Sequence, residues 1–228
     1  LSALPITLNY RPVSHNDGQA TYFREMLRQV MNARPPKRRN FYTEWDYEQA
    51  VKEYENNPIY GWCHKNTKAD GTPYNIYKDG LKIYTTINST MQQYAEEAML
   101  KQLRTVIQPK MDAQYRSTKV LFQNTSAEER EKIVRQAMRY SDRYRALKEE
   151  GRSEAEIDRI FRTPCPTRVF TYRGERDTIL SPRDSILHHK RIMRAGFVAI
   201  EPQTGRVKAY VGGPNFRYFK YDMAKQGK

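Results

Sequence analysis

The chain has 228 residues and carries 40 Lys and Arg against 26 Asp and Glu, a formal net charge of +14. It contains no run of about 18 uninterrupted apolar residues, so we expect no membrane-spanning helix within it. Two cysteines, Cys63 and Cys165, are too few for a disulfide scaffold or a four-cysteine zinc site.

Two helices joined by a basic connection are predicted near the N-terminus. Residues 18–31 place apolar side chains at helical spacing with charges between them, and residues 41–56 form a second helical pattern. The connection at residues 34–39 contains two prolines and four basic residues, which is typical of a linker. Residues 61–70 are predicted to be a loop.

A strand and a long helix are predicted next. Residues 81–87 follow a turn signal and place apolar or β-branched side chains on one face, which is typical of a strand. Thr90 and Gln93 have the spacing of a capping box, so we expect a helix to begin there. Its expected inward residues are Met91, Ala95, Ala98 or Met99, and Val106.

Residues 126–161 are predicted to form a helical hairpin. Ser126 with Glu129 and Ser153 with Glu156 have capping-box spacing, and Gly151 stands where the first helix should end. The apolar stripe of that first helix consists of Ile133, Ala137, Tyr140, Tyr144 and Leu147. Equal numbers of basic and acidic residues favour a packed structural element.

A second hairpin at residues 169–180 is predicted to lead into a helix over residues 181–195, with Ser181 as its N-cap. His188 and His189 are neighbours on this helix. Adjacent helical residues diverge by about 100°, so the pair is not expected to share a metal ion.

A third hairpin is predicted at residues 197–211. Its first strand, residues 197–200, is entirely apolar, and residues 202–205 have turn chemistry. A strand that is apolar on both faces is typical of the interior of a larger sheet. We therefore expect this hairpin to belong to an incomplete sheet.

Three segments in this order resemble class A penicillin-binding proteins. They read GQATYFRE at residues 18–25, GLKIYTTINSTMQQYAEE at residues 80–97, and VAIEPQTGRVKAYVGG at residues 198–213, the last ahead of an aromatic FRYF at residues 216–219. The helical segment at about 110–190 departs from the best-known members and looks like a lineage-specific elaboration.

The resemblance implies a bifunctional peptidoglycan synthase with a glycosyltransferase domain and a D,D-transpeptidase domain that acts through an acyl-serine. A transpeptidase serine lies in S-x-x-K, with S-x-N and K-[ST]-G completing the site. Neither S-x-x-K nor K-[ST]-G occurs here, and Ser14-His-Asn16 matches S-x-N by chance. We expect no catalytic, cofactor-binding or metal-binding residue in this sequence, because the family's active sites would lie before Leu1 and after Lys228.

The predicted fold is α+β, with helical linker segments, short antiparallel strands and a β-hairpin from an incomplete transpeptidase sheet. We divide the chain into a linker region, residues 1–79, and the N-terminal part of a transpeptidase domain, residues 80–228, with the helical insertion at about 110–190. The resemblance implies a non-catalytic part of an extracytoplasmic, periplasmic enzyme anchored in the inner membrane. Peptidoglycan or its precursors are the expected partners of the longer protein.

Two other classes of function stay open. The basic residues concentrate in residues 162–228, so the chain could be a basic binding module for polyanions, either nucleic acid or an anionic wall polymer. No recognised nucleic-acid motif is present, and no specific nucleic acid is expected. Alternatively, the hairpin at residues 126–161 could dock a cell-wall synthesis protein, and the hairpin at residues 197–211 could mediate self-association.

Overall fold

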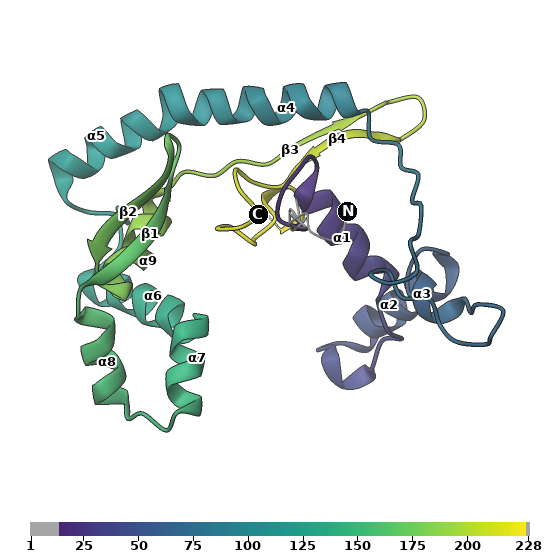
Figure 1. Cartoon of the computed structure of the whole chain (residues 1–228), viewed down its shortest axis with the longest axis horizontal. Helices are drawn as coiled ribbons and strands as arrows, with labels where there is room; N and C mark the ends of the chain where they lie inside the picture. The colour runs from purple at the N-terminus through teal and green to yellow at the C-terminus, as the bar shows by residue number, and fades with distance from the viewer. Residues whose placement is uncertain (1–13, 227–228) are drawn as a thin grey trace, which may run out of the picture. The chain divides into compact units, whose positions relative to one another are not determined.

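The computed structural model describes residues 14–226 and confirms the α+β class, with helices alongside two small antiparallel sheets (Figure 1). The chain forms two compact units. The first unit combines the residues up to Ala95 with those from Gly196 onward, and the second comprises residues 96–195. The boundary therefore falls inside a helix, α4, and each unit is described by itself below.

The first unit contains five α-helical segments, one 3-10 helix and one hairpin within the described residues. Its elements are α1 (Thr21–Met31), η1 (Arg38–Asn40), α2 (Glu44–Asn56), α3 (Trp62–Lys65), the start of α4 (Ser89–Gln102), β3 (Phe197–Ile200), β4 (Val207–Val211) and α10 (Met223–Gln226). The helices predicted at residues 18–31 and 41–56 are confirmed as α1 and α2. The side chain of Thr43 accepts a hydrogen bond from the Asp46 amide and caps α2.

The loop predicted at residues 61–70 is wrong in part, because it contains the short helix α3. Gly61 precedes this helix with φ +68°, and an added Cβ there would lie 2.8 Å from the carbonyl oxygen of Ala33. Cys63 on α3 is fully buried. A helix of one turn is too short to produce a periodic pattern in the sequence, so α3 was not predicted.

The strand predicted at residues 81–87 is wrong. This segment forms no ladder, and it meets β4 only at its end, where the Thr86 hydroxyl donates to the Val207 carbonyl (2.7 Å) and the Asn88 amide donates to the Lys208 carbonyl (2.9 Å). The alternation of its side chains is typical of a strand, but a strand forms only where its backbone can pair by hydrogen bonds with a neighbouring strand, and this segment has no such neighbour among the described residues.

The hairpin predicted at residues 197–211 is confirmed as β3 and β4, which pair antiparallel with Phe197 opposite Val211. The expected burial of the first strand does not hold in this chain, since Phe197 and Ile200 are about half exposed. The second strand is the buried one, with Ala209, Tyr210 and Val211 all inaccessible. That the hairpin is part of a larger sheet stays a prediction.

The long helix is confirmed, but its cap and its buried face were predicted wrongly. The amide of Met91 donates to the side chain of Asn88 (3.0 Å), so the cap lies two residues before Thr90. Of the residues expected to face inward, Ala95, Met99 and Val106 are half-buried and Met91 is exposed, whereas the fully buried side chains are Gln92 and Leu103. The helix continues through a π-helical turn, η2 (Leu103–Ile107), into α5 (Gln108–Thr118).

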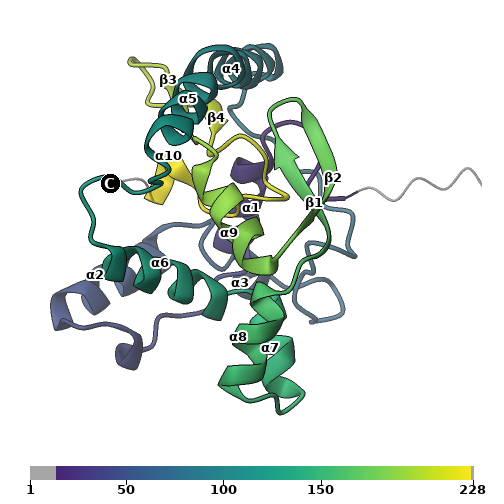
Figure 2. The same ribbon diagram turned by 90° about the vertical axis from the view of Figure 1, so that its left-hand side faces the viewer.

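In the second unit, one helix, α9, lies against the hairpin β1–β2 (Figure 2). Its remaining elements are α6 (Ala127–Arg139), α7 (Asp142–Glu149), α8 (Glu154–Arg162), β1 (Cys165–Thr171), β2 (Gly174–Leu180) and α9 (Pro182–Arg191). The core consists of Val134, Met138, Ile157 and Phe161, with Tyr144, Leu147, Ile186 and Leu187 against it. Helix α9 packs on α6, on α8 and on both strands.

The predicted capping boxes of this unit are confirmed. The side chain of Ser126 accepts from the Glu129 amide while the Glu129 carboxylate accepts from the Ser126 amide, and Ser153 and Glu156 repeat the arrangement. Gly151 adopts φ +77°, the left-handed conformation expected at the end of a helix.

The continuous helix predicted over residues 126–150 is wrong. It breaks at Ser141, whose side chain accepts from the Tyr144 amide and starts α7. The buried side chains of α6 are Val134 and Met138, while Tyr140 of the predicted stripe is largely exposed. Helix α6 thus ends just before Ser141, and α7 begins just after it. The regular apolar spacing across residues 133–147 led to the prediction of one helix in place of two.

Helix α9 is confirmed with Ser181 as its N-cap, but it ends at Arg191 instead of Ala195. Its two histidines bind β1. The Nε2 of His188 lies 2.8 Å from the Phe170 carbonyl, and the Nε2 of His189 accepts from the Phe170 amide (3.4 Å) while its Nδ1 lies 2.9 Å from the Ser185 carbonyl. The pair therefore fastens a helix to a strand.

Both cysteines are free thiols. Cys63 belongs to the first unit and Cys165 to the second. Among residues 14–226, no helix is both long enough and apolar enough to cross a bilayer.

Candidate functional site

Within the described part of the chain, no cluster of three His, Cys, Asp or Glu side chains could hold a metal ion. Ser14 and Asn16 form a local turn, in which the Asn16 side-chain amide donates to the Ser14 hydroxyl (3.0 Å). Lys220 donates to the Asn16 side-chain oxygen (2.6 Å). The hydroxyl of Ser14 thus acts as an acceptor in this turn, and the arrangement supplies no general base for a nucleophile.

In the first unit, α1, the start of α4 and the hairpin β3–β4 meet in a contact region that we call the junction. It is formed by Tyr22, Gln92, Tyr210, Gly212, Gly213 and Phe216. These residues come from segments that are far apart in the sequence, and each of them lies in one of the stretches that carry the family resemblance.

Tyr22 of α1 lies against the Gly212-Gly213 pair that follows β4. A Cβ on Gly212 would lie 2.6 Å from Cγ of Tyr22, and one on Gly213 would lie 2.8 Å from its Cζ. The Tyr22 hydroxyl donates to the Phe219 carbonyl (2.6 Å), and the ring meets Phe216 edge to face at 5.0 Å. The two glycines are therefore required by close approach of a side chain.

Gln92 is completely buried and binds the backbone of Tyr210 with both ends of its amide. Its Nε2 donates to the Tyr210 carbonyl (2.9 Å), and its Oε1 accepts from the Tyr210 amide (2.7 Å). Because these groups of Tyr210 would pair with a neighbouring strand in a wider sheet, the side chain of Gln92 substitutes for a peptide group of that strand.

Ion pairs and burial set the charge state around the junction. Burial, together with the hydrogen bond from the Tyr210 hydroxyl to the Asp222 carboxylate (2.7 Å), raises the pKa of Tyr210 well above its ordinary value. On α1, hydrogen bonds from Arg28 lower the pKa of Glu25. Both shifts favour the form that the group already has at neutral pH, the neutral phenol of Tyr210 and the carboxylate of Glu25.

The comparison with family models gives one match, and it lies in the second unit. Residues 117–193 match the family described as penicillin-binding protein middle domain. No curated protein and no solved structure matches the chain. The match falls on the helical segment at about 110–190 that was expected to be a lineage-specific elaboration; this expectation is wrong in part, because most of the segment matches a described domain family. The match supports a penicillin-binding protein.

The sequence prediction identified the segments of the junction but not its contacts. Gln92 was missed because a buried glutamine has no hydrophobic signature, and Met91 beside it was favoured by apolar character alone. The Gly212-Gly213 pair was visible in the sequence as part of the family-like stretch. Only the structure brings Tyr22 against it.

Proposed function

We propose that this chain is the non-catalytic part of a class A, bifunctional penicillin-binding protein that links and supports its glycosyltransferase and D,D-transpeptidase parts. The observation that carries this proposal is the family match at residues 117–193. It is supported by the junction, because helix α1 from the predicted linker region packs on the hairpin of the predicted transpeptidase part. A linker that shares a core with the domain it precedes transmits its orientation instead of swinging freely.

In this proposal the longer protein is extracytoplasmic and anchored in the inner membrane, and it acts on peptidoglycan precursors. The chain itself carries out no acyl transfer, because it has no serine in S-x-x-K.

The proposal is tested by labelling with a fluorescent penicillin, comparing the 228-residue chain with the longer protein encoded by the same gene. We expect covalent labelling of the longer protein and none of the chain above a heat-denatured control. A serine of the chain that becomes labelled would contradict the assignment of this part as non-catalytic. A longer protein that neither binds penicillin nor polymerises lipid-linked disaccharide would contradict the family proposal itself.

A further inference from the structure

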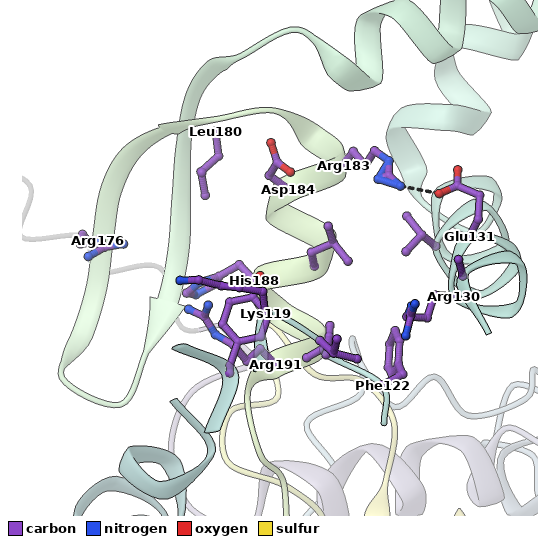
Figure 3. A pocket seen from close by; sticks show the side chains of 16 residues that line it. Lys119, Phe122, Arg130, Glu131, Arg176, Leu180, Arg183, Asp184, His188 and Arg191 are labelled. Atoms are coloured by element: carbon purple, nitrogen blue, oxygen red, sulfur yellow. Dashed lines mark hydrogen bonds and ion pairs between the residues drawn. The ribbon is translucent and has the colours of Figure 1, made fainter. Parts of the chain in front are cut away.

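The second unit contains a cavity of about 550 Å³ between the α5–α6 connection, α6, β2 and α9 (Figure 3). Its volume lies within the range of about 300–1,000 Å³ that small-molecule sites occupy. Part of its wall is apolar and is contributed by Tyr115, Val120, Leu121, Phe122, Val134 and Leu187.

The polar part of the wall is strongly basic. Five cationic side chains line it, against two carboxylates: Lys119, Arg130, Arg176, Arg183 and Arg191, with Glu131 and Asp184.

Both carboxylates are engaged within the protein. Glu131 accepts from Arg183 (2.5 Å) and pairs with Arg135 on its own helix (3.3 Å), while Asp184 accepts from the Ser181 hydroxyl (2.6 Å) at the start of α9. With five cationic and two anionic side chains, the wall keeps a net positive charge.

Three of the cations have no acidic partner. Within residues 14–226, neither Lys119 nor Arg176 makes an ion pair or a side-chain hydrogen bond, and Arg130 donates only to the Thr125 carbonyl (3.0 Å). Arg191 is held in place, with its guanidinium over the ring of Tyr115 (4.8 Å) and 3.4 Å from Asp112. The cavity therefore combines anchored and unpaired positive charges.

The basic side chains of the cavity also affect the pKa of His188, which lines the same wall. Burial is the main factor that lowers the pKa of His188, and the positive charges of Arg191 and Arg176 lower it further, while the Phe170 carbonyl and Asp112 oppose the change. His188, Arg176 and Arg191 also line an adjoining cavity of about 620 Å³. These three side chains thus border both cavities.

We propose that this cavity binds an organic oxyanion, namely a carboxylate or phosphate group carried on an apolar or aromatic body. Guanidinium groups match the planar or tetrahedral oxygens of such anions with paired N–H donors. The apolar wall beside them accommodates the body of the ligand. The proposal concerns the second unit alone and does not depend on the proposed function.

The test uses 1-naphthyl phosphate and 1-naphthoate as the phosphate and carboxylate probes, with 1-naphthylmethylamine as a cation of the same shape. Isothermal titration calorimetry on the 228-residue chain should show saturable binding of at least one anion and none of the amine. The relative affinity of the two anions distinguishes a phosphate site from a carboxylate site. Equal binding of the amine, or binding of no probe, would overturn the proposal.

The variant Lys119→Gln/Arg176→Gln should weaken anion binding by about tenfold or more, because it removes two charge-assisted donors. The control variant Lys132→Gln/Arg139→Gln removes the same two charge types from exposed positions of α6 outside the cavity and should leave binding within about twofold. Equal weakening in both variants would reveal attraction by net charge alone and would contradict a built site.

A measurement on the unaltered chain covers the case in which the double variant does not fold. With histidine labelled for NMR, a bound anion should raise the pKa of His188, since it offsets the field of Arg176 and Arg191. His64, in the first unit, serves as the internal reference. An unchanged His188 titration at saturating anion would place the ligand elsewhere.

Discussion

Gln92 shows how one buried polar side chain can hold a sheet edge. It is inaccessible to water, and its side-chain amide donates to the Tyr210 carbonyl and accepts from the Tyr210 amide. Loss of this side chain would leave a buried N–H and a buried C=O without partners, and each unmet group costs about 1–3 kcal/mol.

We predict that Gln92→Ala lowers the free energy of unfolding by about 2–4 kcal/mol, as measured by urea denaturation. Gln102→Ala, an exposed glutamine on the same helix, is the matched control and should change stability by less than about 0.5 kcal/mol. Equal effects of the two substitutions would mean that Gln92 contributes no more than an ordinary surface residue.

The close approach of Tyr22 to the glycine pair gives a second prediction at this scale. The backbone at Gly213 is outside the left-handed region, so the cost of Gly213→Ala is steric and should be about 1–3 kcal/mol. Tyr22→Phe should cost about 0.5–1.5 kcal/mol because the Phe219 carbonyl loses its donor.

The double variant distinguishes this contact from a general loss of packing. The hydroxyl of Tyr22 is the atom nearest to the added methyl group, so removing it should relieve part of the clash. We expect the combined loss in a double-mutant cycle to be smaller than the sum of the single losses by about 0.5 kcal/mol or more. Strict additivity would show that the two sites act independently.

At the scale of helices and strands, local capping patterns predicted three helix starts correctly, although the cap expected at Thr90 lies at Asn88 and the one at Ser141 was not predicted. The caps at Ser126, Ser153 and Ser181 each depend on residues within three positions, and all three are confirmed. The strand predicted at residues 81–87 failed because pairing is decided by a distant partner.

The contacts of the candidate site could not be predicted from the sequence either, because they join residues that are far apart along the chain. The family-like segments were recognised along the chain, but the contact of Tyr22 with Gly213 spans 191 positions and has no sequence signal of its own. Likewise, the cavity of the second unit collects Lys119, Arg130 and Arg176 from three separate elements. Such clusters follow from the fold and could not be derived from spacing.

The attachment of α9 to β1 leads to a pH prediction. Burial lowers the pKa of His188 and of His189 below their ordinary value of 6.5, so the folded state favours the neutral rings. The unfolded chain then takes up protons first as the pH falls below about 6.5, and the stabilisation present above that pH is lost.

We therefore expect the thermal midpoint of the chain to fall between pH 7.5 and pH 5.5, above the range in which carboxylates titrate. His189→Gln should reduce this dependence, because the group that accepts from the Phe170 amide no longer binds a proton. His64→Gln, at an exposed position, should retain the full dependence. An unchanged slope in the His189 variant would exclude this residue as a source of the pH effect.

For the whole molecule, the exposed apolar strand β3 is the feature with the largest consequence for behaviour in solution. Phe197 and Ile200 are about half exposed, and unpaired apolar strand edges associate with other chains. We predict that the 228-residue chain forms concentration-dependent dimers through this hairpin, as measured by sedimentation velocity.

Ile200→Lys should shift the chain toward monomer, because the new charge opposes pairing along the edge. Ile179→Lys adds the same charge at an exposed isoleucine on β2 in the other unit and should leave association unchanged. Monomeric behaviour of the unaltered chain at all concentrations would contradict the prediction.

The amide of Gln92 also restricts the topology of any larger protein that contains this hairpin. With Tyr210 already bound by a side chain from a helix, no strand can be inserted next to β4 without displacing Gln92. Further strands can join only beside β3, so β4 would be the outermost strand of the completed sheet. In such a sheet, the strand order would be partly determined by one glutamine, Gln92, which precedes the hairpin by more than 100 residues.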